Sequence, residues 1–273
     1  MTAKPDWGIE SITCYDGRDH LVEINKKITG AFGDLIHFNV LGREPAPRKI
    51  LLVAPMSGHY STLLRSTVNS LIIDSEIYVT DWHNARDIPV SEGSFDIEDY
   101  TKYLIDYIRF LGPDINVIAI CQPAPLALVA TAFLAQEKKD DQPKSLILMG
   151  GPIDPSAAPT EITEFGNKFN LEYLEQTVIQ RVGFKYAGVG RQVFPGLLQL
   201  MSFMSMNAEK HAKSFSDQIA KVAQGIASEH DKHNSFYDEY LAVMDMTAEF
   251  YLSTVDRIVK KREIAENKLT NMG

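Results

Sequence analysis

The sequence contains little cysteine, and this shortage excludes two kinds of architecture. Only Cys14 and Cys121 occur among 273 residues, and their wide separation does not match the spacing of metal ligands. Such usage predicts neither a disulfide framework nor a zinc site, and it favours a reducing, cytoplasmic setting. We therefore expect no bound metal and no other cofactor.

Basic charge and long apolar runs are also scarce. The chain carries 27 Lys and Arg against 36 Asp and Glu, and no local cluster of basic residues offsets this excess of negative charge. A negative surface repels phosphate backbones, so nucleic acid is not an expected partner. No stretch approaches the roughly 18 consecutive apolar residues of a membrane span, and the first ten residues lack the apolar core of an export signal. We expect an intracellular protein without a membrane span.

What the chain does contain is a series of short apolar strands. The runs over residues 49–54, 76–80, 115–120 and 145–149 are continuous, as in strands buried on both faces, and helical patterns lie between them. Residues 31–41 alternate as a half-buried strand does, and the lone His37 within them is best explained as structural. Right-handed crossovers would assemble these elements into an α/β fold with a doubly wound, mainly parallel sheet.

The sharpest local pattern is I-N-V-I-A-I-C-Q-P-A-P, residues 115–125. A buried strand stops at Cys121 and a helix follows, which is how an α/β-hydrolase presents its nucleophile. Ala119 and Pro123 replace the glycines of the usual G-x-S-x-G turn; alanine is small, and proline suits a first helical turn. A helix start favours the reactive thiolate, so Cys121 is the candidate nucleophile. The alternative is an inert cysteine at a strand end.

Backbone donors for an oxyanion are expected beside this turn. The N–H of Gln122 follows the nucleophile, and a second N–H, from Met56 or Ser57, follows the strand that ends at residue 54. An ordinary strand-to-helix turn would explain the same spacing. His59 and Trp82 are possible pocket residues. His59 is better placed to shape its loop than to act as a base, and a packed Trp82 is an equal alternative.

The second half predicts helices only after Pro159. We expect an incomplete α/β-hydrolase core over residues 1–155, a helical insertion or cap over 156–234, and one long helix from Ser235 that returns toward the core within 235–273. The Met- and Phe-rich stretch F-P-G-L-L-Q-L-M-S-F-M-S-M, residues 194–206, favours a buried segment over a polymer-binding surface.

Several segments together resemble the intracellular polyhydroxyalkanoate (poly-3-hydroxybutyrate) depolymerases. They are L-L-V-A-P-M-S-G-H-Y-S-T-L-L-R (51–65), Y-V-T-D-W-H-N-A-R (78–86), V-I-A-I-C-Q-P-A (117–124), L-M-G-G-P-I-D (148–154), residues 194–207 and residues 236–256. The resemblance implies an α/β-hydrolase with a helical C-terminal region. It also implies cleavage of stored 3-hydroxyalkanoate polyester through Cys121, at the surface of cytoplasmic storage granules. His83 stands where this family more usually has arginine.

The same resemblance places the acid and the histidine of the catalytic triad after two further strands, which this sequence does not contain. The family also has a longer N-terminal region. We therefore expect a chain that is incomplete at both ends, without a triad acid or base in the usual position, and with weak or no hydrolysis. Asp154 is an alternative acid, but a turn residue before Pro155 is the simpler interpretation. The sequence carries no indication of oligomeric state.

Two other functions stay open. A polyhydroxyalkanoate synthase-like acyltransferase would also use a cysteine, although Gln122 and Pro123 stand where glycines are usual. A non-catalytic granule-associated protein would bind polymer through the helical insertion, and Cys121 would then be a relic.

Overall fold

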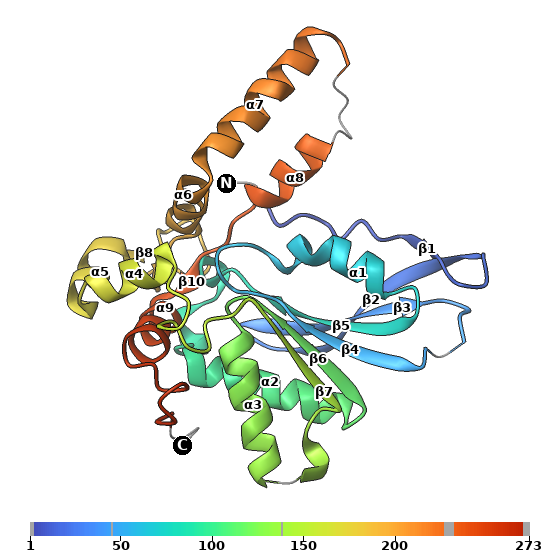
Figure 1. The fold of residues 1–273 in the computed structure, drawn as a ribbon, viewed down its shortest axis with the longest axis horizontal. Coiled ribbons are helices and arrows are strands. Elements are labelled where there is room, and N and C mark those ends of the chain that lie inside the picture. The colour runs from blue at the N-terminus through green and yellow to red at the C-terminus, as the bar shows by residue number, and fades with distance from the viewer. Residues whose placement is uncertain (1–2, 45, 138, 227–231, 270–273) are drawn as a thin grey trace.

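A seven-stranded sheet organises the protein in the order β1-β2-β3-β5-β4-β6-β7 (Figure 1). The computed structural model describes residues 3–44, 46–137, 139–226 and 232–269. The strands are β1 (Ser11–Thr13), β2 (Asp19–Thr29), β3 (Gly33–Val40), β4 (Arg48–Val53), β5 (Ser75–Trp82), β6 (Ile115–Ile120) and β7 (Ser145–Met149). The pairs β4·β5, β4·β6 and β6·β7 are parallel, while β1·β2, β2·β3 and β3·β5 are antiparallel.

Helices cover both faces of this sheet, which confirms the expected α/β class with a doubly wound sheet. A 3-10 turn (Ser61–Leu64) and α1 (Arg65–Leu71) lie on one face, and α2 (Ile97–Leu111) and α3 (Ala124–Glu137) on the other (Figure 1). The start of α2 is fixed by a capping box in which the Asp96 carboxylate accepts from the N–H groups of Glu98 and Asp99. The buried face of α2 carries the apolar stripe that its sequence period predicts.

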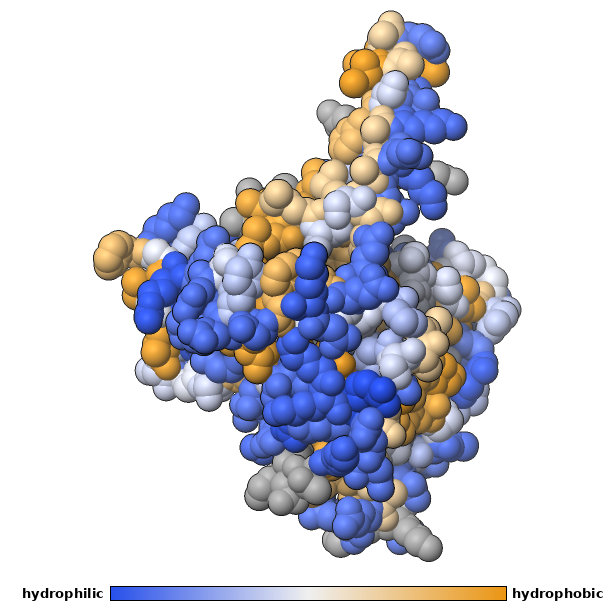
Figure 2. All heavy atoms as spheres, turned by 60° about the vertical axis from the view of Figure 1, so that its left-hand side comes forward, coloured by the Kyte–Doolittle hydropathy of each residue, from blue (hydrophilic) through white to orange (hydrophobic). Residues whose placement is uncertain are grey.

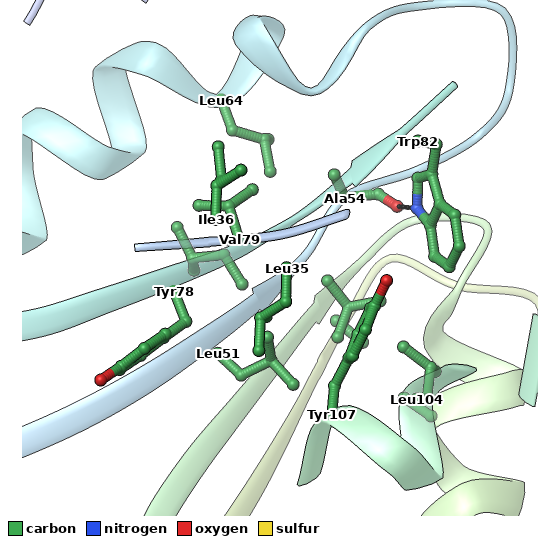
Figure 3. Packing of buried hydrophobic residues seen from close by; sticks show 14 of the residues in the cluster. Leu35, Ile36, Leu51, Ala54, Leu64, Tyr78, Val79, Trp82, Leu104 and Tyr107 are labelled. Carbon is green, nitrogen blue, oxygen red and sulfur yellow. Dashed lines mark hydrogen bonds between the residues drawn. The ribbon is translucent and has the colours of Figure 1, made fainter. Parts of the chain in front are cut away.

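The core lies on both faces of the sheet and includes residues of α1, α2 and α3. Figure 3 shows Trp82, Leu104 and Tyr107 packed beside Leu35 and Leu51 of the strands. β3 is buried along nearly its whole length, so the expectation of a half-buried strand is wrong. The reason is its position, because β3 lies inside the sheet between β2 and β5.

β7 forms one edge of the sheet among the described residues. Its side chains alternate between partly covered and exposed, and Ile147 and Met149 are 47% and 50% exposed. The N–H groups of its inner side pair with β6, with Ile118 opposite Ile147.

The expectation of helices only after Pro159 is wrong. A second, antiparallel sheet forms from β8 (Gln180–Arg181), β9 (Gln192–Phe194) and β10 (Met246–Thr247), in the order β10-β9-β8. Arg191 anchors it, because its guanidinium donates to the carbonyls of Ile88, Pro89 and Gly93. Strands of two or three residues are too short to show a period in the sequence.

The expected helix from Ser235 is interrupted. α8 spans Lys232–Tyr240, α9 spans Ala248–Ser253, and a π-helical turn covers Thr254–Lys260. Residues 241–245 between α8 and β10 are not helical, and Ala242, Val243 and Met244 are almost completely buried. The Met244 N–H donates to the Gly58 carbonyl at 2.8 Å, a distant partner that replaces a helical one. The division at residues 155 and 234 stays a prediction.

The remaining helices are α4 (Glu161–Lys168), α5 (Leu171–Val178), α6 (Gly196–Met206) and α7 (Ala208–Ala223). We call α6, α7 and α8 the arm, because α7 and α8 project away from the sheet as a helical pair (Figure 1). Most of residues 201–206 are exposed, so the expectation of a buried Met/Phe segment is wrong; Gly196, Gln199 and Leu200 in the first half of α6 are the buried exceptions. No helix of the described residues has the length and apolar character to cross a membrane.

His37 is buried in β3, as its structural interpretation requires, and its ring stacks on Tyr78 with centroids 4.4 Å apart. Burial, together with the charges of Lys27, Arg43 and Lys49, lowers the pKa of His37 to about 4. The unfolded chain takes up this proton near pH 6.5 and the folded chain does not, so the free energy of unfolding falls as the pH drops from 6.5 to 4.

Replacing His37 with Phe should remove this loss and keep a ring against Tyr78. The difference in unfolding free energy between His37→Phe and the original chain should therefore be about 2 kcal/mol more favourable to the variant at pH 5 than at pH 8. Denaturant unfolding at both pH values measures it. His20→Gln is the control. The Leu41 carbonyl and Asp16 raise the pKa of His20, so this variant should lose unfolding free energy relative to the original chain at pH 5 compared with pH 8. A pH-independent difference for His37→Phe would contradict the assignment.

Candidate active site

Cys121 lies in a tight turn between β6 and α3. Its backbone is left-handed, with φ +66°, a conformation that residues other than glycine seldom adopt. The Cys121 N–H donates to the Met149 carbonyl at 2.7 Å, and the Cys121 carbonyl accepts from the Ala124 N–H at 3.1 Å. The thiol is free and exposed to solvent. Strand, strained turn and helix follow one another as the sequence predicts.

Small neighbours make room for this turn. Ala119 is completely buried in β6. A Cβ on Gly151 would lie 2.2 Å from the Ala124 Cβ and 2.5 Å from the Cys121 carbonyl oxygen, so only glycine fits there. The Pro123 carbonyl accepts from the Ala127 N–H at 2.9 Å, which places Pro123 at the start of α3, where its missing N–H is harmless.

The predicted oxyanion donors come together beside this turn. β4 and β6 are parallel neighbours, with Val53 opposite Ala119, so residues that follow the two strands meet at the same edge. We call residues 55–59 the oxyanion loop. Its Met56 N–H donates to Oε1 of Gln122 at 3.0 Å, a direct bond between the loop and the turn.

This hydrogen bond distinguishes the two candidate oxyanion donors of the loop, the N–H groups of Met56 and Ser57. The Met56 N–H is occupied by Gln122. Among the described residues, the N–H groups of Ser57 and Gln122 donate no hydrogen bond within the protein. A turn closed by the Gly58 N–H on the Met56 carbonyl, at 2.9 Å, presents Ser57, and Gly58 has φ +87°. The two open donors are therefore those of Ser57 and Gln122.

The sequence left two roles open for Trp82, a pocket residue or a packed core residue, and its burial agrees with the second. It is 1% exposed, and its indole N–H donates to the Ala54 carbonyl at 2.9 Å (Figure 3). The same carbonyl accepts from the Tyr100 hydroxyl at 3.2 Å, and the Ala54 N–H donates to Oγ1 of Thr80 at 2.9 Å. Ala54 is thus held on both sides immediately before the oxyanion loop.

His59 is also buried rather than open to a pocket, with 6% of its surface exposed. Its Nε2 lies 3.0 Å from the Tyr240 carbonyl. Burial lowers the pKa of His59, and the facing backbone groups of Tyr240 and Ser57 oppose that shift only in part. These contacts agree with the prediction that His59 shapes its loop rather than acts as a base.

A base and an acid for Cys121 are not found among the described residues. No described histidine hydrogen bonds to the Cys121 thiol; His83, for example, contacts Asp34 at 3.1 Å and the Ala31 carbonyl at 3.1 Å. His230 lies outside the described residues. The Asp154 carboxylate accepts from the Ser156 hydroxyl and N–H, which lower the pKa of Asp154, as in an ordinary turn. The described residues contain no group of His, Cys, Asp and Glu that could hold a metal ion.

Sequence reasoning missed two contributors to this site. Gly151 is essential to the turn, but two consecutive glycines after a strand also occur in plain loops. The second is the side chain of Gln122, because the sequence pattern assigns a role only to the backbone N–H of this residue. The contact of the side chain with Met56 joins residues far apart in sequence, so no local pattern indicates it.

The strain at Cys121 leads to a stability prediction. Glycine adopts φ +66° freely, so the free energy of unfolding of Cys121→Gly should be about 1 kcal/mol higher than that of Cys121→Ala. Denaturant titration of both variants measures this difference. Cys14 provides the control: its φ is not positive, so Cys14→Gly should be less stable than Cys14→Ala. Equal stability of the two Cys121 variants would show that the turn is not strained.

No curated protein matches the sequence. Similar solved structures include the Vlm2 thioesterase domain, with 14% identity, a TM-score of 0.38, and coverage of 50% of this chain and 56% of that chain. An esterase from the archaeon Pyrobaculum calidifontis has 17% identity, a TM-score of 0.34, and coverage of 54% and 48%. An esterase from the fungus Rhizomucor miehei has 12% identity, a TM-score of 0.39, and coverage of 55% and 50%.

The chain thus spans about half the length of these structures, and at such scores the similarity carries no information about activity. The family comparison is more specific. Residues 150–273 match the family described as PHB de-polymerase C-terminus. Over this part of the chain, the resemblance to poly-3-hydroxybutyrate depolymerases that the sequence motifs indicated is therefore confirmed.

Proposed function

We propose that this protein is a carboxylic ester hydrolase that cleaves 3-hydroxyalkanoate polyester, with Cys121 as its nucleophile. One observation carries the proposal: an exposed thiol stands on a left-handed turn between a buried strand and a helix. Strain of this kind persists where the surrounding structure enforces it, which is common at catalytic positions. The family match over residues 150–273 supports the polyester as substrate.

The chemistry is acyl transfer. The Cys121 sulfur bonds to the carbonyl carbon of the ester, the ester C–O bond breaks, and the departing alkoxide oxygen takes the thiol proton and leaves as a hydroxyl group. During attack, the carbonyl oxygen becomes an oxyanion, which accepts from the open N–H groups of Ser57 and Gln122. Water then cleaves the thioester, which releases the hydroxyacid and restores the thiol.

The second step needs a base, and in our proposal a histidine activates that water. Members of a catalytic triad act as a unit, so loss of one member lowers turnover by orders of magnitude. Since no described histidine bonds to Cys121, we expect acylation of this chain to outpace release of the product.

Polymer contact is assigned to the arm. Apolar side chains on α6 and α7 recur at helical spacing and stay exposed; we call them the apolar stripe, which consists of Leu197, Met201, Phe215, Ile219 and Val222. Figure 2 shows a band of apolar surface along one side of the arm and hydrophilic surface along the other. A neutral stripe on a projecting helix suits an extended, uncharged and water-insoluble surface such as a polyester particle.

The apolar stripe also favours a second candidate function. A granule-associated protein would need the arm to bind polymer but would not need a reactive thiol. The two functions differ in the chemistry of Cys121, so an ester probe separates them.

Under the hydrolase proposal, p-nitrophenyl butyrate should release one equivalent of nitrophenol per chain in a burst, and the thioester should map to Cys121 by mass spectrometry. Cys121→Ala should lower the acylation rate at least about a thousandfold. Cys14→Ala is the matched control, because Cys14 is buried, and it should leave the burst unchanged. Absence of labelling in the original chain would favour the non-catalytic polymer binder.

The role of the arm gives a separate prediction. The pair Ile219→Glu and Val222→Glu places two charges on side chains that are 70% and 62% exposed. Affinity for amorphous poly-3-hydroxybutyrate particles, measured by sedimentation, should fall at least about tenfold, since each buried apolar side chain contributes about 1.5–3 kcal/mol. The burst with the small ester should persist.

A control pair, Ser216→Glu and Ala220→Glu, adds the same charge to exposed positions of α7 outside the stripe. Particle binding should stay within about twofold of the original chain. Equal losses for both pairs would indicate a general charge effect and would contradict the assignment of the stripe.

A further inference from the structure

The oxyanion loop is held from two sides by parts of the chain that are distant in sequence. From the turn side, Oε1 of Gln122 binds the Met56 N–H. From the other side, the base of the arm and the segment after it contact Gly58 and His59. This second contact has no part in the chemistry described above, although it bears on the residues that present the oxyanion donors.

The imidazole of His59 makes the most specific of these contacts. Its Nε2 lies 3.0 Å from the carbonyl oxygen of Tyr240, the last residue of α8. A carbonyl can only accept, so Nε2 carries the hydrogen and donates it. The ring also packs against Phe203 of α6 and against the Tyr240 ring, with centroids 5.7 Å and 5.1 Å away. One buried ring therefore joins the loop to two helices of the arm.

The backbone around His59 also contacts the arm and the segment that follows it. His59 forms an antiparallel bridge with Val243, and the Gly58 carbonyl accepts from the Met244 N–H at 2.8 Å. A Cβ on Gly58 would lie 3.0 Å from the Cβ of Gln199 in α6, so the loop backbone approaches the arm closely. Neither side of the loop can move without breaking hydrogen bonds that are partly buried, and such bonds are costly to leave unmade.

We propose that His59 is a positioning residue for ester cleavage: its hydrogen bond to the Tyr240 carbonyl ties the oxyanion loop to the arm and fixes the Ser57 N–H relative to the Gln122 N–H. The inference rests on the proposed function and deepens it. Because Tyr240 belongs to the arm, the element assigned to polymer contact and the donors assigned to the oxyanion share one rigid connection. A donor displaced by about 1 Å loses on the order of a hundredfold in rate.

The test compares two replacements of His59. His59→Phe keeps a ring against Phe203 and Tyr240 but removes the donor, whereas His59→Gln keeps an amide N–H near the position of Nε2. The burst with p-nitrophenyl butyrate should slow about a hundredfold in His59→Phe, with the half-saturating ester concentration within about twofold. His59→Gln should recover the rate to within about fivefold of the original chain.

Hydrogen exchange provides a readout that needs no activity. The Met56 and Gly58 amides, which donate the hydrogen bonds of the loop, should exchange faster in His59→Phe than in the original chain, and His59→Gln should restore their protection. Phe203→Leu is the matched control, because it removes a ring contact and leaves the hydrogen bond intact; its loop exchange should not change. If His59→Phe does not fold, His59→Asn replaces it, since its amide is one carbon too short to reach Tyr240.

Three results would overturn the inference: an unchanged burst in His59→Phe, equal losses in both His59 variants, or unchanged loop exchange in His59→Phe. If the original chain itself gives no burst, the proposed hydrolase function fails. The exchange comparison then decides on its own whether His59 holds the loop.

Discussion

The parallel pairing of β4 with β6 is the constraint on which the candidate site depends. The two strands are more than one crossover apart in sequence, and their pairing brings their carboxyl ends together, with Val53 opposite Ala119. The oxyanion loop and the Cys121 turn leave the sheet side by side for this reason alone. The hydrogen bond from Met56 to the Gln122 side chain then fixes the two segments to each other. Rigid strands thus place the reactive groups, and loops only present them.

The turn itself is possible because its neighbours are small. A left-handed cysteine stores strain, and a close-packed surrounding holds it there. Gly151 is the clearest example, since any side chain would collide with Ala124 and the Cys121 carbonyl. The glycines that usually flank such a nucleophile are absent, and Gly151 from the neighbouring strand end supplies the missing space. Sequence motifs defined by adjacent residues overlook this kind of substitution.

Much of the central sheet could be predicted, because continuous apolar strands and their intervening helices are local signals. Cys121 and the Met56–Ser57 segment could be placed for the same reason. β2 was harder to predict: it carries Lys and Glu and lies largely exposed near the edge of the sheet. Residues 241–245 could not be predicted, because their composition suits a helix and their hydrogen bonds go to residues distant in sequence, such as Gly58 and Asn84.

The arm shows a different limit of sequence reasoning. Met201 and Phe203 have the composition of a core, yet Met201 is exposed and Phe203 contacts His59 from the arm. Apolar content alone does not distinguish a side chain that packs inside its own chain from one that awaits a partner. Only the placement of α6 and α7 outside the sheet domain makes that distinction.

β7 has a consequence for how the protein behaves in solution. Its outer edge pairs with no other strand among the described residues, and it presents Ile147 and Met149 without any charged side chain along Ser145–Met149. Natural sheets commonly protect such edges with charges, prolines or covering segments. An edge without such protection presents unpaired N–H and C=O groups, which are a template for the addition of a further strand.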